Sequence, residues 1–173
     1  MRLWAALGSI LPRIAKRTKL LGLVSCTLLT LAGLATAASS SEHQLLAGGA
    51  AVKWGPPPPA FPAGAQFAVI DGDPAGTGLV TVRFKMPAGY KIAPHWHPTD
   101  EHVTVLSGTL GIGMGDTFNT GHGQTLKAGG YAVAPAGMHH YAWTASGATI
   151  QVHLNGPFAI TYVNPADDPS AKK

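Results

Sequence analysis

Two histidines and a glutamate lie within seven residues of one another in the middle of the chain. His95 and His97 are two positions apart, so on an extended strand both imidazoles project from the same face. Residues 98–100 read Pro-Thr-Asp and break the strand, and a turn there would let Glu101 return toward the two rings. With a fourth donor from elsewhere, this set of groups predicts a site for a divalent transition metal. The alternative is a group of solvated polar residues beside a turn.

The fourth donor is expected in a second histidine-containing stretch, GGYAVAPAGMHHYAW, at residues 129–143. Pro135 and Gly137 favour a turn, and the strand that follows opens with His139 and His140. Either histidine fits at this point, because two adjacent residues of a strand face opposite sides and the register is not known. Tyr141 and Trp143 alternate with His140 and are expected to serve in packing.

The elements that must position these residues are short apolar segments separated by Gly, Pro, Asn and Asp. A spacing of about eight to twelve residues between such segments is typical of an all-β sandwich or barrel, and no window carries a sustained helical pattern. In addition to the extended stretch around His95, the sequence predicts strands at Gln66–Ile70, Gly78–Lys85, His102–Leu106, Thr109–Met114, Gln124–Lys127, Tyr131–Ala134, His139–Trp143, Thr149–Leu154 and Phe158–Val163.

The two histidine stretches resemble the two motifs of the cupin superfamily. The first motif is a glycine, an HxH pair, a glutamate and a second glycine, and it is met at Gly89, His95, His97, Glu101 and Gly108. The second is met at Gly129, Pro135, Gly137 and His140. It departs at its last position, where Thr144 stands in place of asparagine, and this puts a local turn contact in doubt. The motifs cover residues 89–144, and the strand pattern extends the resemblance over about 66–163.

The resemblance implies a cupin-type jelly-roll β-barrel with a metal ion inside its mouth. The implied ligands are His95, His97, Glu101 and His140, with His139 as the alternative in the second stretch. The ion is expected to be one of Fe, Mn, Zn, Ni or Cu. Four protein ligands leave two open positions on a six-coordinate ion, which is enough for a substrate or for dioxygen beside it.

Alternation along the strand that begins at Glu101 predicts which neighbours line the pocket. If Glu101 faces inward, Val103 and Val105 face inward as well, and His102 and Thr104 face the other side. His102 is therefore expected to be a non-ligand.

Three polar residues on other strands are further pocket candidates. Gln151 and His153 share one face of their strand, opposite Ile150, Val152 and Leu154. If that polar face points inward, the two side chains can bond a ligand or a metal-bound water; if outward, they are solvated. The same two options apply to Arg83.

The first 37 residues have the pattern of a secretory signal peptide. Five basic residues precede an apolar run from Leu20 to Ala35, and Ala35, Thr36 and Ala37 form a small-residue cleavage pattern. The run is too short to span a bilayer, so no stable membrane span is expected in the mature form. Export to the periplasm or the extracellular space is predicted. The alternative is lipidation of Cys26, the only cysteine, which would anchor the domain to a membrane.

The net charge of +4 belongs to this leader. After residue 37 seven basic residues stand against eight acids, so the basic balance of the whole chain does not predict a nucleic-acid partner. Residues 38–65 form a Pro/Gly/Ala-rich arm that either lies against the domain or a partner subunit or acts as a disordered spacer. Residues 66–163 are the predicted barrel, and 164–173 a flexible tail.

These features predict an exported, metal-binding cupin protein that acts on a small organic molecule as an oxygenase or an isomerase. Two alternatives stay open. One is a non-catalytic module that binds a small ligand through its metal, and the other is a structural barrel braced by the ion, with a homodimer as a candidate assembly.

Overall fold

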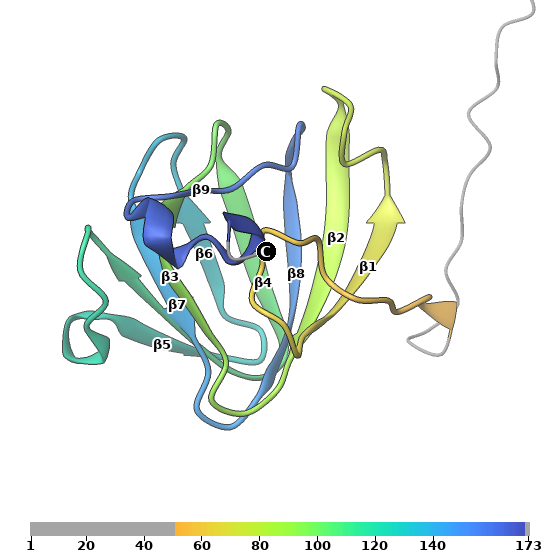
Figure 1. Ribbon diagram of the computed structural model, residues 1–173. Helices are drawn as coiled ribbons and strands as arrows, with labels where there is room; N and C mark the ends of the chain where they lie inside the picture. The colour runs from red at the N-terminus through yellow and green to blue at the C-terminus, as the bar shows by residue number, and fades with distance from the viewer. Residues whose placement is uncertain (1–50, 172–173) are drawn as a thin grey trace, which may run out of the picture. The chain divides into compact units, whose positions relative to one another are not determined.

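The computed structural model describes residues 51–171, all of which belong to the unit that begins at Gln44. The predicted signal peptide, Cys26 and residues 38–50 of the arm lie outside the described residues. The described chain is built from strands and short 3-10 turns (Figure 1), in agreement with the all-β prediction. The strands are β1 (Gln66–Asp71), β2 (Leu79–Met86), β3 (Lys91–Trp96), β4 (Glu101–Met114), β5 (Gln124–Lys127), β6 (Tyr131–Ala134), β7 (His140–Trp143), β8 (Ala148–Asn155) and β9 (Thr161–Tyr162).

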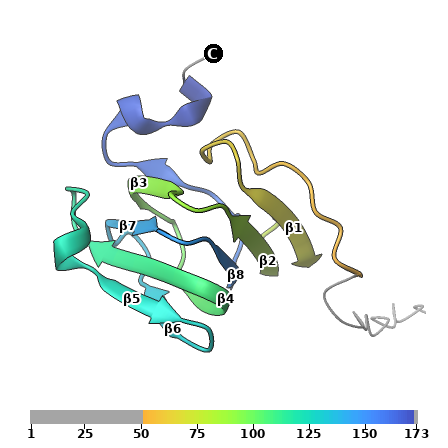
Figure 2. The ribbon, with the colours of Figure 1, turned by 90° about the horizontal axis from the view of Figure 1, so that it is seen from below.

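The strands form one antiparallel sheet in the order β1-β2-β8-β4-β7-β3-β9, with β5 and β6 paired to β4. The sheet curls around its interior (Figure 2). Strand β4 belongs to both halves of the curl, because its first half pairs with β6 and β8 and its second half pairs with β5 and β7. The fold is therefore the jelly-roll type of barrel that the sequence predicts.

Strand β4 corrects the prediction of two separate strands at His102–Leu106 and Thr109–Met114. The chain bends within one strand of 14 residues, and its register against β8 shifts between Val105 and Ser107. Gly108 has a φ of 74°, and a Cβ there would lie 2.1 Å from the carbonyl oxygen of Gly147. Gly108 thus permits the close approach to Gly147 just after the bulge, and the strand bends there and continues.

Strand β9 is shorter than the predicted Phe158–Val163. Only Thr161 and Tyr162 pair with β3. The amide of Phe158 donates instead to the carbonyl of Pro74, and its ring packs on Phe61. The segment before Thr161 is therefore held by a loop and by aromatic packing.

The core lies on the inner face of the curled sheet, and alternation along β2 and β8 places it there. In β8 every second residue is buried, and so is every second residue of β2. These residues are Ala148, Ile150, Val152 and Leu154 in β8, and Val80, Val82, Phe84 and Met86 in β2. Each strand thus presents its apolar side to the interior and its polar side outward.

The described part of the arm covers this core. Phe61 is buried, and its ring centroid lies 4.9 Å from that of Phe84. The hydroxyl of Tyr162 donates to the carbonyl of Ala60, and that of Tyr90 donates to the carbonyl of Pro62. Residues 55–65 therefore pack against the domain, which is one of the alternatives that the sequence left open for the arm.

The C-terminal residues, expected to be a flexible tail, contain two 3-10 turns, η3 (Pro165–Asp167) and η4 (Pro169–Ala171). Asn164 caps the first of them by accepting a hydrogen bond from the amide of Ala166. Within residues 51–171 no helix has the length and apolar character needed to cross a membrane.

Candidate metal centre

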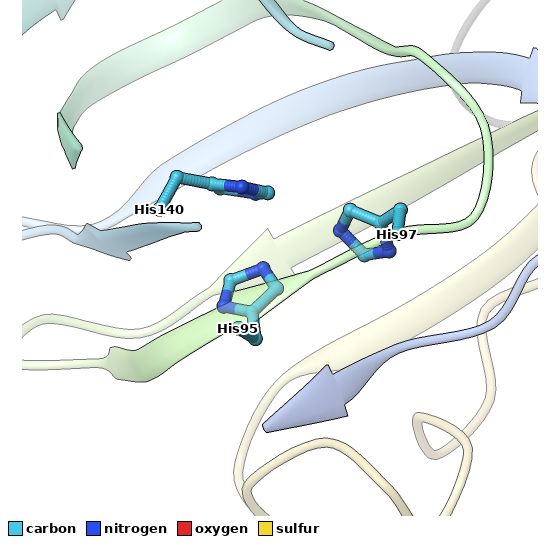
Figure 3. A group of neighbouring side chains, drawn as sticks. All are labelled: His95, His97 and His140. Carbon is cyan, nitrogen blue, oxygen red and sulfur yellow. The ribbon is translucent and has the colours of Figure 1, made fainter. Parts of the chain in front are cut away.

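Three histidines meet on the inner face of the sheet (Figure 3). His95 lies near the end of β3, His97 follows that strand, and His140 opens β7. His95 and His140 are register partners in the β3–β7 pair, so their side chains leave the sheet on the same side. Two strands that are far apart in the sequence therefore bring the predicted histidines together.

The three rings are close enough to share one ion. Each offers a ring nitrogen, and these nitrogens all lie within 4.8 Å of one another. All three side chains are buried, with His95, His97 and His140 exposed by 3%, 2% and 3%.

Main-chain carbonyls fix the orientation and the tautomer of each ring. Nδ1 of His95 donates to the carbonyl of Ala93 at 2.7 Å, and Nδ1 of His97 donates to that of Ala159 at 2.6 Å. Nδ1 of His140 donates in the same way to Met138 at 3.0 Å. Because a carbonyl oxygen only accepts, each Nδ1 carries a proton, and Nε2 is the ring nitrogen left for an ion.

Glu101 lies at the edge of this cluster. It is the first residue of β4, and its side chain is 13% exposed. Its Oε1 is 3.6 Å from Nε2 of His97, and its Oε2 is 3.4 Å from Nε2 of His140. The ligand atoms that all lie within 4.8 Å of one another belong to the three histidines and do not include Glu101. Glu101 therefore contacts two of the histidines without being part of that group.

The charges of the site follow from burial and from these contacts. Burial, reinforced by His140 and His97, lowers the pKa of His95 to about 3, so this ring is neutral. Burial alone would raise the pKa of Glu101, but the nearby His97 and His140 outweigh it and hold that pKa at about 2. The glutamate is therefore an anion in the cavity.

The site fits a divalent transition metal on a specific observation. Nε2 of His97 and Nε2 of His140 are buried and make no hydrogen bond. Buried polar atoms in folded proteins nearly always have partners, and an orphan points to an ion or a ligand. Imidazole nitrogens that have given up the Nε2 proton, beside a carboxylate, form the donor set that Fe, Ni, Cu and Zn accept. The three histidines can hold such an ion.

The cavity beside the histidines is small and mostly apolar. It has a volume of about 30 Å³, enough for an ion with a water molecule. Its wall includes Val103 as predicted, whereas Val105 is buried in the core and does not line the cavity. The full lining is Phe61, Phe84, Ile92, His95, His97, Glu101, Val103, Leu110, Ile112, His140, Ala142, Ile150 and Val152.

Three pocket candidates lie on the outer face of the sheet, away from this cavity. Gln151 and His153 alternate with the buried residues of β8, and Arg83 pairs with Gln151 in register. Arg83 Nε donates to Gln151 Oε1 at 2.9 Å. The inward option for these residues is wrong, because the apolar side chains of β2 and β8 occupy the interior.

The neighbouring histidines also point away from the cluster. His102 contacts the hydroxyl of Tyr131 on the outer face, and Nδ1 of His139 lies 2.6 Å from Oδ1 of Asp116. Of the adjacent pair in the second stretch, His140 is the one in the cluster. Tyr141 is buried, and its hydroxyl donates to the carbonyl of Asn119.

Thr144, where the second motif departs from its pattern, closes a turn. It is buried, and its Oγ1 accepts a hydrogen bond from the amide of Gly147 at 3.0 Å. Its own amide donates to Tyr90, and its carbonyl accepts from Gly89. A hydroxyl and the main chain thus provide the turn contacts that the substitution had put in doubt.

A second, larger cavity lies beside the first and was missed by sequence reasoning. It has a volume of about 380 Å³, and Ile112 lines both cavities. Met114 lies at its edge and is the register partner of His140, so the two side chains share a face. The alternation of Leu110, Ile112 and Met114 along β4 is the signal that could have located it.

Comparisons with known proteins agree with this geometry. Residues 42–159 match the family described as the ChrR cupin-like domain. A germin-like protein 3-1 from Oryza sativa subsp. japonica is 35% identical over 80 residues, which are 46% of this chain and 36% of the rice protein. The chain thus spans about a third of the length of that relative.

Solved structures share the fold at low identity. The polyketide cyclase RemF from Streptomyces resistomycificus superposes with a TM-score of 0.61 at 18% identity, covering 74% of this chain and 91% of the cyclase. The DMSP lyase DddQ from Ruegeria pomeroyi superposes with a TM-score of 0.53 at 21% identity, covering 67% of this chain and 63% of the lyase. At these identities the likeness concerns the fold alone.

Proposed function

The chain belongs to the ChrR cupin-like domain family, and from this premise we propose that it is a metal-dependent enzyme acting on a small organic molecule. One observation carries the proposal. Two buried imidazole nitrogens, Nε2 of His97 and Nε2 of His140, lie beside a small cavity and make no hydrogen bond, with the oxygens of Glu101 at 3.6 and 3.4 Å. Main-chain carbonyls hold both rings in that orientation, so the arrangement is built into the backbone.

The residues that would hold the ion are His95, His97, Glu101 and His140, and the ion is one of Fe, Mn, Zn, Ni or Cu. When bound, such an ion supplies Lewis acidity and, for Fe, Mn or Cu, redox chemistry with dioxygen. The protein itself orients the ligand side chains and keeps water out of the cavity. The carbonyl bonds keep the imidazoles in place, the anionic Glu101 offsets positive charge, and the apolar wall excludes water.

The substrate would enter through the larger cavity. The space beside the histidines, at about 30 Å³, is too small for an organic molecule, whereas the adjoining cavity of about 380 Å³ is within the usual range for ligands. Ile112, Met114 and Leu126 line that cavity together with the amide of Gln124. These walls favour a small, largely apolar molecule with a polar end that reaches the histidines.

The reaction type we propose is that of an oxygenase or an isomerase, in which the ion orients and polarises the substrate. Around the smaller cavity, the four candidate ligands are the only described side chains that can transfer a proton. The fold hosts small-molecule enzymes among its structural neighbours, including the cyclase and the lyase named above.

Among the described residues that line the smaller cavity, none apart from the candidate ligands can act as a general acid or base. This favours a second candidate function, a non-catalytic module that binds a small ligand through its metal. One experiment separates the two. The full-length chain is loaded in turn with each of the five metals and incubated with catechols, flavonoids and thiol acids. Dioxygen uptake detects an oxygenase, and chromatography of the compounds detects an isomerised product. His97→Ala serves as the test variant and His139→Ala as the matched control.

Turnover by the wild-type chain and by His139→Ala, but not by His97→Ala, supports the enzyme. Saturable binding of a compound without turnover supports the binding module. Turnover that His97→Ala retains contradicts the proposed site.

We also propose that the protein is exported. The basic, apolar and small-residue order of residues 1–37 supports this. N-terminal analysis of the protein from cytoplasmic, periplasmic and membrane fractions by mass spectrometry tests it. A terminus at residue 38 indicates cleavage after Ala37, an acylated terminus at Cys26 indicates a lipoprotein, and an intact Met1 in the cytoplasmic fraction contradicts export.

A further inference from the structure

Two histidines that are not part of the metal centre face each other on the outer side of the sheet. His102 of β4 and His153 of β8 are register partners across the antiparallel pair. Their ring centroids are 6.2 Å apart, with an interplanar angle of 38°. Both side chains are half-buried, and both alternate with core residues, so they stand on the surface opposite the interior.

A tyrosine on the neighbouring strand orients one of the two rings. The hydroxyl of Tyr131, on β6, lies 2.5 Å from Nδ1 of His102. A hydrogen bond at Nδ1 leaves Nε2 of the same ring available to a ligand, which is the arrangement found around histidines that bind metals. Tyr131 itself is 53% exposed, so the group lies at the surface.

The two histidines share a concave surface with a carboxylate. A cavity of about 420 Å³ on this face is lined by His102, His153 and Tyr131, together with Asp100, Asn155 and the exposed Leu79. Asp100 accepts a hydrogen bond from the amide of Ala136 through Oδ1, which fixes its position beside the pair.

The spacing of the rings is slightly wider than one ion requires. With a metal to nitrogen distance of about 2.1 Å and tetrahedral angles, two ring centroids on one ion lie about 5.2 Å apart. The observed 6.2 Å reaches this value after a rotation of the two half-buried side chains that brings the rings about 1 Å closer. The interior histidines, at 4.2 to 5.3 Å, are closer together.

The geometry points to a second metal site, in which His102 and His153 chelate one divalent transition ion on the outer face of β4 and β8. Imidazole pairs favour Cu²⁺, Ni²⁺ and Zn²⁺, with water and an oxygen donor completing the coordination. The site is independent of the proposed enzyme activity, since its ligands stand on the opposite side of β4 from Glu101.

Zinc binding to the full-length, untagged, metal-free chain, followed by isothermal titration calorimetry, tests this site. The wild-type chain is expected to bind Zn²⁺ at two sites. His153→Ala and His102→Ala are each expected to weaken one of them on the order of 100-fold, because the second imidazole of a chelate acts at high effective concentration. His122→Ala, a change to an exposed histidine outside the pair, is the matched control and should leave both sites unchanged.

The outcomes distinguish this site from the interior one. Loss of one site in His153→Ala and of the other in His97→Ala supports two separate sites, and loss in His153→Ala alone supports the outer site even if the interior site binds no zinc. Unchanged binding in His153→Ala, or an equal loss in His122→Ala, contradicts the outer site.

Tyr131→Phe adds a readout that a purely structural role would not produce. The change keeps the ring and removes the hydroxyl that contacts His102. Zinc affinity at the outer site should fall about tenfold, as expected when a hydrogen bond to a ligand histidine is lost, while the interior site is unchanged. Wild-type affinity at the outer site would show that Tyr131 does not position His102.

Discussion

The two faces of β4 carry different histidine chemistry within adjacent residues. On the inner face, Glu101 contacts a buried group of three histidines. On the outer face, the next residue, His102, pairs with His153 at the surface. A one-residue step along the strand separates a dry cavity from solvent, because successive side chains of a strand point to opposite sides.

The partners of the histidines differ in the same way. Each interior ring donates its Nδ1 proton to a main-chain carbonyl, and these carbonyls are fixed by the fold. The outer ring of His102 contacts a side chain, the exposed Tyr131, which can rotate. The interior group is thus preorganised for one geometry, whereas the outer pair can adapt to the ion it meets.

The largest expected effect comes from replacing one of two adjacent histidines, His140, by alanine. The same change at its neighbour His139 is the control. His140→Ala removes an interior ligand, and zinc affinity at that site should fall on the order of 100-fold because one arm of the chelate is lost. His139→Ala changes a residue that contacts Asp116 outside the cluster and should leave the affinity unchanged. Both are compared in a His153→Ala background by competition with a chromophoric chelator. Similar losses in the two variants would contradict the inward assignment of His140.

A second prediction concerns the second half of β4, where it pairs with β7. Here the ring of Tyr141 covers the outer face of the strand. At Gly113 an added Cβ would lie 2.2 Å from a ring carbon of Tyr141, so Gly113→Ala should destabilise the fold by about 3 kcal/mol. Gly78→Ala is the control, since no atom lies within 4 Å of a Cβ there. Urea unfolding measures both. A loss below about 0.5 kcal/mol at Gly113 would show that Tyr141 can move aside.

A third prediction compares neighbouring residues of β4 on opposite faces. Val103→Ala removes buried methyl groups and should cost about 2 kcal/mol of unfolding free energy. Thr104→Ala, on the outer face, should stay within about 0.5 kcal/mol of the wild type. Equal costs in urea unfolding would show that the outer face is covered in solution.

The smallest effect is expected at the outer pair of Arg83 and Gln151. Arg83→Met keeps an apolar stem and removes the hydrogen bond to Gln151, so the expected cost is about 1 kcal/mol. Metal content should not change, because neither residue reaches the cavity. A lower metal content in the folded variant would contradict the outward placement of this pair.

The fold and much of the site could be predicted because they depend on local pattern. The bounds of β5 and β6 agree with the predicted strands, and residue type and spacing point to His95 and His97. The choice of His140 over His139 depended on the resemblance to the cupin motif. The outward position of His153 could also have been deduced, since Ile150 and Val152 of the same strand must face the core.

Other features depend on contacts that no local pattern contains. The carbonyls of Ala93, Met138 and Ala159 orient the histidines, and main-chain groups carry no residue-type signal. The continuity of β4 through Gly108 depends on where Gly147 lies in space. Long-range packing therefore determines the orientation of the rings and the continuity of β4. Local alternation determines only which side chains face the interior.

Metal analysis of the purified full-length chain shows whether the interior histidines hold a transition metal. The wild-type chain and His97→Ala, both reconstituted with each candidate metal and desalted, are compared by elemental analysis. We expect about one equivalent more of a divalent transition metal in the wild type, with the same circular dichroism spectrum for both proteins. A difference below about half an equivalent for every metal, in equally folded proteins, would contradict it.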